Sequence, residues 1–157
     1  MIRQTTIKTA VTVSGVGLHT GAKVNLTFKP AAENHGYKFC RTDIAGQPVI
    51  DADADNVTDT SRGTTLEQNG AKVSTTEHAL AALVGCEIDN VLIEVDGPEV
   101  PIMDGSSKPF VDALLKAGIE TQSAERIYYE LKENLTFEEP ARKLRCWRYQ
   151  VKIIESP

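Results

Sequence analysis

The sequence predicts an α+β domain, a two-layer sandwich in which two helices pack on one face of a mostly antiparallel or mixed sheet. Three observations support this fold class. Apolar residues alternate along the N-terminal segment, an Asn-Gly pair separates two short strand-like runs, and two segments with helical spacing flank a further strand. With 157 residues, the chain is long enough to bury a core.

The first half of the chain is predicted to be rich in strands. Apolar residues alternate across 7–28 on both sides of SGVGLHTGA, which predicts a β-hairpin with a glycine-rich turn. Pro30 closes this hairpin, and residues 37–43 are predicted to form a third strand. Two short strands, 63–67 and 71–73, follow, and the sequence Gln-Asn-Gly between them is typical of a hairpin turn.

The first predicted helix begins at Ser74, in the stretch STTEHALAAL (74–83). Ser74 and Glu77 have the spacing of a capping box, in which each side chain binds an amide that the first helical turn leaves unpaired. Gly85 is predicted to end this helix, because glycine is common just after the last helical residue.

A further strand and a second helix follow. The alternation within residues 91–95 predicts a strand with one apolar face. Ser106 or Ser107 is predicted to cap a helix that ends at Gly118. Four apolar positions of this helix recur at helical spacing, namely Phe110, Val111, Leu114 and Leu115.

The predicted domain organisation places a first α+β domain at residues 1–123 and the start of a second domain at 124–143. Residues 126–137 (RIYYELKENLTF) are predicted to form a strand. The stretch 144–157 is atypical and holds the only tryptophan, and two interpretations of it stay open. It is either a terminal strand that includes Tyr149, Val151 and Ile153, or a non-native tail produced by a reading-frame shift or a truncation.

Composition excludes several classes of function. A net charge of −5 and a pI near 5.2 argue against nucleic acid or an anionic membrane as a partner. The three cysteines have no CxxC spacing, which favours reduced thiols in a cytoplasmic protein. No apolar run is long enough for a membrane span, and no signal peptide is visible. The chain is therefore predicted to be a soluble cytoplasmic protein.

The pair Glu77-His78 has two interpretations. From spacing alone, helix capping is favoured for Glu77, and a satisfied core or rim position is favoured for His78. The zincin pattern requires a second histidine four residues later, where this chain has Ala82. His19 and His35 show no spacing that marks a shared site. Because catalytic zinc normally takes three protein ligands, the residues alone indicate one ligand and no complete site.

Three other motifs are better explained as local structure. GVGLHTG (15–21) has Thr20 where the dinucleotide fingerprint needs its third glycine. DADADN (51–56) lacks the glycine and the distal glutamate of a calcium loop, so calcium binding is not predicted. Asp104-Gly105 in PIMDGSS is predicted to be a structural turn before the second helix.

Four stretches together resemble the UDP-3-O-acyl-N-acetylglucosamine deacetylases, the zinc amidases that commit the lipid A pathway of Gram-negative bacteria. They are VSGVGLHTG (13–21), VTDTSRGTTL (57–66), STTEHALAAL (74–83) and IDNVLIEVDGPEVPIMDGS (88–106). The likeness runs in order from Met1 to about Glu120. It implies a fold of two similar α+β halves that face each other across the active site, and this chain is similar to the first half.

The resemblance also implies a reaction and its residues. His78 is expected to be a ligand of Zn²⁺, and Glu77 is expected to be the general base that activates the zinc-bound water for attack on the acetamide. The family's other ligands, a histidine and an aspartate, and its catalytic histidine belong to the second half. With a single ligand, the isolated chain is predicted to be inactive.

The loop that contains Thr60, Ser61, Arg62 and Gly63 is expected to contact the substrate, an acylated UDP-N-acetylglucosamine. Whether Arg62 meets the charge of that substrate or extends into water stays open. His19 and Asp104 fall in family motifs, and structural or supporting roles are expected for both.

One alternative belongs to a different class of function. A stable α+β domain of this kind also suits a non-catalytic binding or assembly module. The face that a second half would cover is predicted to be partly apolar, so self-association through that face is also expected. The resemblance leaves a further possibility open, a longer parent gene, because in some bacterial lineages the family is fused to an acyl-carrier-protein dehydratase.

Overall fold

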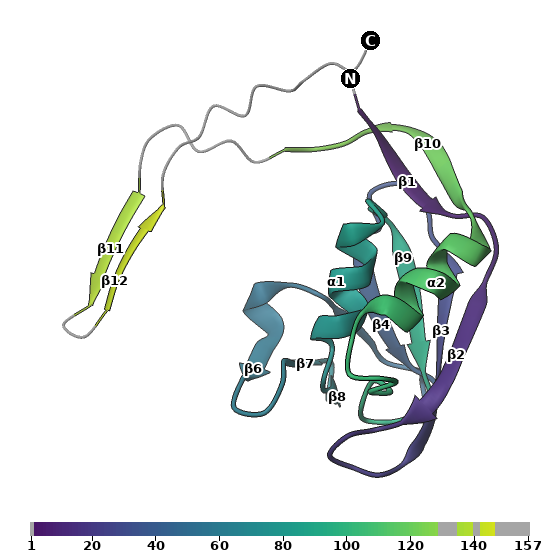
Figure 1. Cartoon of the computed structure of the whole chain (residues 1–157), viewed down its shortest axis with the longest axis horizontal. Helices are drawn as coiled ribbons and strands as arrows, with labels where there is room; N and C mark the ends of the chain where they lie inside the picture. The colour runs from purple at the N-terminus through teal and green to yellow at the C-terminus, as the bar shows by residue number, and fades with distance from the viewer. Residues whose placement is uncertain (1, 129–134, 140–141, 147–157) are drawn as a thin grey trace. The chain divides into compact units, whose positions relative to one another are not determined.

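The computed structural model describes residues 2–128, 135–139 and 142–146 (Figure 1). The chain divides into two compact units, Met1–Arg126 and Ile127–Pro157. The predicted domain limits, with a boundary after residue 123, stay a prediction. None of the helices in the described part of the chain combines the length and apolarity needed to cross a bilayer.

A mixed five-stranded sheet forms the centre of the first unit, with the strand order β2-β3-β9-β4-β5. Neighbouring strands are antiparallel except β4 and β9, which are parallel. The strands are β2 (Val11–Val16), β3 (Lys23–Pro30), β4 (Tyr37–Arg41), β5 (Val49–Asp51) and β9 (Val91–Val95).

Two smaller sheets complete the unit. β1 (Arg3–Ile7) and β10 (Ile119–Glu125) form an antiparallel ribbon. A short 3-10 helix (Ala54–Asn56) leads into a three-stranded antiparallel sheet. The strands of that sheet are β6 (Val57–Asp59), β7 (Thr65–Gln68) and β8 (Ala71–Val73).

Both helices, α1 (Glu77–Gly85) and α2 (Lys108–Ala117), lie on the same face of the central sheet (Figure 1). The core fills the space between helices and sheet. Phe28 of β3 and Phe110 of α2 are fully buried there and meet edge to face, with ring centroids 6.3 Å apart. The predicted α+β sandwich is therefore confirmed.

Several local predictions are confirmed. β2 and β3 pair as the hairpin predicted around the glycine-rich turn. β7 and β8 are joined by Asn69-Gly70, and both residues have positive φ (54° and 73°), as a two-residue hairpin loop of this kind requires. The predicted strands at 37–43 and 91–95 correspond to β4 and β9.

Three local details differ from the prediction. Ile7 belongs to β1, which pairs with β10 rather than with the hairpin, because alternation reports a strand but not its partner. Gly85 is the last residue of α1 and does not follow it, and the residue with positive φ near this end is Glu87 (55°). Leu115 is 58% exposed, since the buried stripe of α2 runs through Phe110, Leu114 and Ala117.

The predicted capping box at the start of α1 is wrong. Ser74 pairs with Glu99 in an isolated parallel β-bridge, and its backbone bonds Pro98 and Val100. The residue before the helix is Thr76, which makes no side-chain capping bond. Ser74 extends the strand-like path of the chain past β8, so its hydroxyl is not available to the first helical turn.

The predicted strand at 126–137 is only partly correct. Residues 126–128 are not in a strand, and 129–134 lie outside the described residues. Residues 135–137 fall within β11 (Leu135–Glu139), which pairs antiparallel with β12 (Arg142–Cys146). The predicted terminal strand through Tyr149, Val151 and Ile153 also lies outside the described residues.

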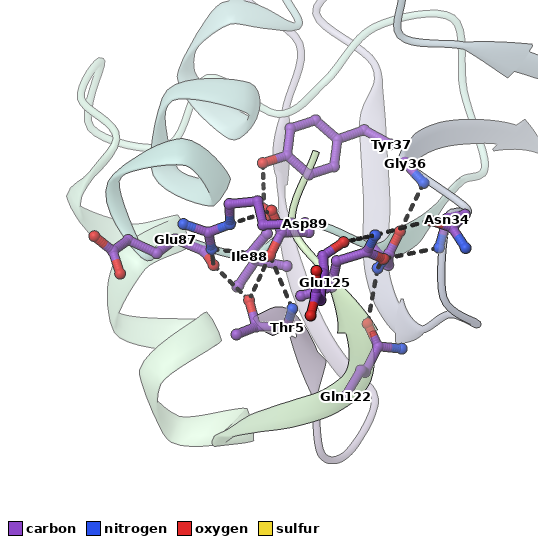
Figure 2. A network of polar contacts seen from close by, with 12 residues as sticks. Thr5, Asn34, Gly36, Tyr37, Glu87, Ile88, Asp89, Gln122 and Glu125 are labelled. Carbon is purple, nitrogen blue, oxygen red and sulfur yellow. Dashed lines mark hydrogen bonds and ion pairs between the residues drawn. The ribbon is translucent and has the colours of Figure 1, made fainter. Parts of the chain in front are cut away.

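Figure 2 shows a polar network that ties the β1–β10 ribbon to the connection between α1 and β9. The buried amide of Asn90 donates to Gln4 (2.8 Å) and to Gln122 (2.7 Å). Asp89 accepts from the backbone amide of Thr5 (2.8 Å) and pairs with Arg126 (2.8 Å). Because buried polar groups are costly unless they are paired, this network holds both strands of the ribbon against the connection between α1 and β9.

Candidate functional site

The site is built around the start of α1, where Glu77 and His78 are both half-buried. The chain reaches this point from β8 through two backbone bonds, from Ser74 to the carbonyl of Pro98 and from Val100 to the carbonyl of Ser74, each 3.0 Å long. Thr75 then takes a positive φ of 58°, which turns the chain into the helix. The first helical turn therefore starts from a fixed position beside β8.

The carboxylate of Glu77 faces the loop before β7. Its Oε2 accepts a hydrogen bond from the backbone amide of Thr64 (2.9 Å). Gly63 lies so close that a Cβ added there would be 3.2 Å from Glu77 Oε1, and its φ of 150° also disfavours other residues. Gly63 thus leaves room for this carboxylate, and the backbone of the loop orients it.

The loop itself is shaped by local hydrogen bonds. Asp59 Oδ1 accepts from the amide of Ser61 (2.9 Å). This bond, with the side chain of Ser61, holds the pKa of Asp59 below its ordinary value. Thr60, Ser61 and Arg62 are exposed. His19 Nε2 donates to the carbonyl oxygen of Arg62 (3.0 Å), which links this loop to the turn between β2 and β3.

A polar cavity of about 180 Å³ lies between these segments. It is smaller than the roughly 300–1,000 Å³ of typical ligand pockets, so it cannot by itself enclose a nucleotide sugar. Of the predicted site residues, His19, Arg62 and Gly63 meet here. The full lining is His19, Asp59, Arg62, Gly63, Thr65, Ser74 and Thr75.

Asp104 does not line this cavity. It lines a separate depression beside Gly15, Met103 and Pro109. Its Oδ1 accepts from the hydroxyl of Ser106 (2.8 Å) and from the Ser106 amide (2.9 Å), and these bonds lower the pKa of Asp104. Its contacts are those of a turn residue just before α2.

Sequence reasoning missed Glu99, which is only 1% exposed. Its carboxylate accepts from the amides of His19 (3.0 Å) and Thr20 (2.8 Å) and from the hydroxyls of Thr20 (2.8 Å) and Thr75 (3.0 Å). Burial acts to raise the pKa of Glu99, but these hydrogen bonds outweigh it, so that the pKa is lowered and the group stays ionised. The only signal in the sequence is an acidic residue within the otherwise apolar run PEVPI.

The described residues do not form a zinc site by themselves. Among them, no three histidine, cysteine, aspartate or glutamate side chains gather closely enough to hold a metal ion. Catalytic zinc normally takes three protein ligands, and His78 offers one imidazole. A zinc ion at this position therefore requires ligands from other residues.

Comparison with known proteins connects this geometry to a family. The profile of the family described as LpxC, UDP-3-O-acyl N-acetylglycosamine deacetylase, matches residues 4–153. The UDP-3-O-acyl-N-acetylglucosamine deacetylase of Methylococcus capsulatus is 49% identical over 139 residues, which are 88% of this chain and 46% of the relative. That of Vibrio vulnificus is 50% identical over 140 residues, with the same coverage of 88% and 46%.

A second kind of relative is longer. The bifunctional enzyme LpxC/FabZ of Bacteroides thetaiotaomicron is 53% identical over 137 residues, which are 87% of this chain and 30% of that enzyme. The chain thus spans less than half the length of the relatives it matches.

Proposed function

This chain belongs to the LpxC family of UDP-3-O-acyl N-acetylglycosamine deacetylases, and from that premise we propose that it forms the first part of such a deacetylase. The proposed reaction hydrolyses the acetamide of an acylated UDP-N-acetylglucosamine and releases acetate, a step of lipid A synthesis. The remaining part of the active site comes from residues outside those that the structure describes.

The placement of Glu77 is the observation that carries this proposal. One carboxylate oxygen accepts a hydrogen bond from the Thr64 amide. The other lies against Gly63, which has no side chain to displace it. A half-buried carboxylate with a fixed direction suits a general base that takes a proton from the attacking water. The neighbouring residue, His78, supplies an imidazole from the same helical turn.

Members of this family are zinc-dependent. Zinc, when bound, supplies a Lewis acid and makes a coordinated water more acidic. We propose His78 as one of its ligands, and the others lie outside the described residues of this chain. The alternative, a non-catalytic binding or assembly module, predicts instead that Glu77 and His78 only stabilise the fold.

The exposed loop that holds Thr60, Ser61, Arg62 and Gly63 is the proposed substrate contact. The guanidinium of Arg62 is exposed beside the polar cavity and suits an anionic group such as a diphosphate. Because the cavity is too small to enclose the whole substrate, a second wall is expected from the remainder of the enzyme. The cytoplasmic location and self-association through an exposed face stay predictions.

A chimera tests the proposal. Residues 1–126 of this chain replace the matching segment of the Methylococcus capsulatus deacetylase, and acetate release from an acylated UDP-N-acetylglucosamine is measured. We expect the chimera to be active and the isolated chain to be inactive. A chimera that folds like its parent but releases no acetate would contradict the proposed function, and activity of the isolated chain would contradict its dependence on a second part.

A further inference from the structure

We infer that Glu99 is a positioning residue of this site, because its buried carboxylate closes a ring of contacts that directs the carboxylate of Glu77. This inference rests on the proposed function, in which Glu77 takes a proton from water. The ring consists of Glu99, Thr75, Glu77, Thr64, Arg62 and His19. Four links are hydrogen bonds, and the other two, from Thr75 to Glu77 and from Thr64 to Arg62, are each two peptide units of the backbone.

The charge of Glu99 is compensated in an unusual way. No ion pair in the described part of the chain includes it, although its side chain is almost completely buried. Its oxygens bind four neutral donors from His19, Thr20 and Thr75 instead. Burying an ionised carboxylate is costly unless such donors are in place, so the donors and the carboxylate fix one another.

On one side, the ring runs from Glu99 to the start of α1. The Thr75 hydroxyl donates to Glu99 Oε1 (3.0 Å), and the positive φ of Thr75 is unfavourable for a β-branched residue. Glu77 follows two residues later. The hydrogen bond to Glu99 therefore helps to hold the backbone conformation of Thr75. This conformation sets where α1 begins and thereby the direction of the Glu77 side chain.

On the other side, the ring runs from Glu99 to the loop that binds Glu77. Glu99 fixes the His19 amide, and the ring of His19 binds the carbonyl of Arg62 (3.0 Å). Thr64 lies two residues further along this loop, and its amide donates to Glu77 Oε2 (2.9 Å). The position of the donor to Glu77 therefore also depends on Glu99, whose side-chain hydrogen bonds within the described residues go to His19, Thr20 and Thr75.

Nuclear magnetic resonance of the ¹⁵N-labelled chain tests this inference. In Glu99→Gln, a side chain of the same length loses its charge and places an NH₂ donor among groups that donate. We expect the amide cross-peaks of His19 and Thr20 to shift and the cross-peak of Thr64 to shift with them. A role confined to local stability would change the unfolding midpoint but leave the Thr64 cross-peak in place.

A second variant and a control complete the experiment. Thr75→Val removes one hydroxyl at nearly constant volume, and we expect it to shift the Thr64 cross-peak even if Glu99→Gln does not fold. Asp96→Asn is the matched control, because Asp96 also accepts from a backbone amide, that of Asn25 (2.7 Å), outside the ring. It is expected to shift Asn25 and leave Thr64 unchanged.

A Thr64 cross-peak that stays in place in the folded variants, or that shifts equally in the control, would overturn the inference. Unfolding of both ring variants, with the control folded, would also overturn it by making Glu99 a residue of the core. Enzyme activity plays no part in this measurement. An inactive chimera with an intact ring response would therefore reject the proposed function and leave the geometry standing.

Discussion

Replacing Glu77 by glutamine in the chimera is expected to lower acetate release by about 10²–10⁴-fold, the range that general bases contribute. Glutamine keeps the shape of the side chain and an oxygen that accepts from the Thr64 amide, so the local structure is preserved. It cannot take a proton from water. We therefore expect kcat to fall while the unfolding midpoint of the chimera stays nearly constant.

Glu67→Gln provides the control for this prediction. Glu67 is an exposed carboxylate on β7, three residues after Thr64, and it lies opposite Lys72 across the β7–β8 hairpin. Its replacement is expected to leave acetate release unchanged. If Glu77→Gln retained the activity of the control variant, Glu77 would not be the general base.

Replacing Gly17 by alanine is expected to lower the free energy of unfolding by about 3 kcal/mol, measured by urea denaturation of the chain. A Cβ at this position would lie 2.3 Å from Thr20 Oγ1 and 2.4 Å from Glu99 Oε2. Both are far inside van der Waals contact, so the two side-chain oxygens would have to move, which weakens the hydrogen bond between Thr20 and Glu99. The buried carboxylate would then lose part of its compensation.

Gly85→Ala is the matched control for Gly17→Ala. Gly85 ends α1, and an added Cβ there would meet no atom within 4 Å. Alanine is expected to stabilise the chain slightly at this position, by up to about 1 kcal/mol, because it favours the helical backbone more than glycine does. Equal unfolding midpoints for the two variants would show that the space around Gly17 is not limiting.

Elements set by local chemistry were predictable from the sequence. The hairpin between β7 and β8 follows from Asn69-Gly70, and α2 ends directly before Gly118 as predicted. The predicted serine cap is only partly correct, because Ser107 precedes the helix without a side-chain capping bond, whereas the Ser106 hydroxyl accepts from the amide of Lys108 (3.2 Å). The ribbon of β1 and β10 was not predictable, because its two strands are far apart in the chain and residues 119–125 show no clear alternation. The pairing of these two distant strands in the folded chain, and not their local sequence, determines the ribbon.

The start of α1 shows why a local signal can fail. Ser74 and Glu77 have the spacing of a capping box, yet the β-bridge between Ser74 and Glu99 takes the serine out of reach of the helix. Glu77 is bound by Thr64, a partner that no helix motif includes. The resemblance to a family indicated Glu77 and His78, whereas the part played by Glu99 depends on three segments that meet only in the folded chain.

Zinc binding is the most direct test of the claim that this chain holds only part of a catalytic site. Zinc stoichiometry and affinity are measured after dialysis for the isolated chain and for the chimera, each with and without His78→Ala. We predict one tightly bound zinc in the chimera, weakened by His78→Ala, and no tight zinc in the isolated chain. One tight zinc per isolated chain, lost on His78→Ala, would contradict the account, because this chain would then hold a complete ligand set of its own.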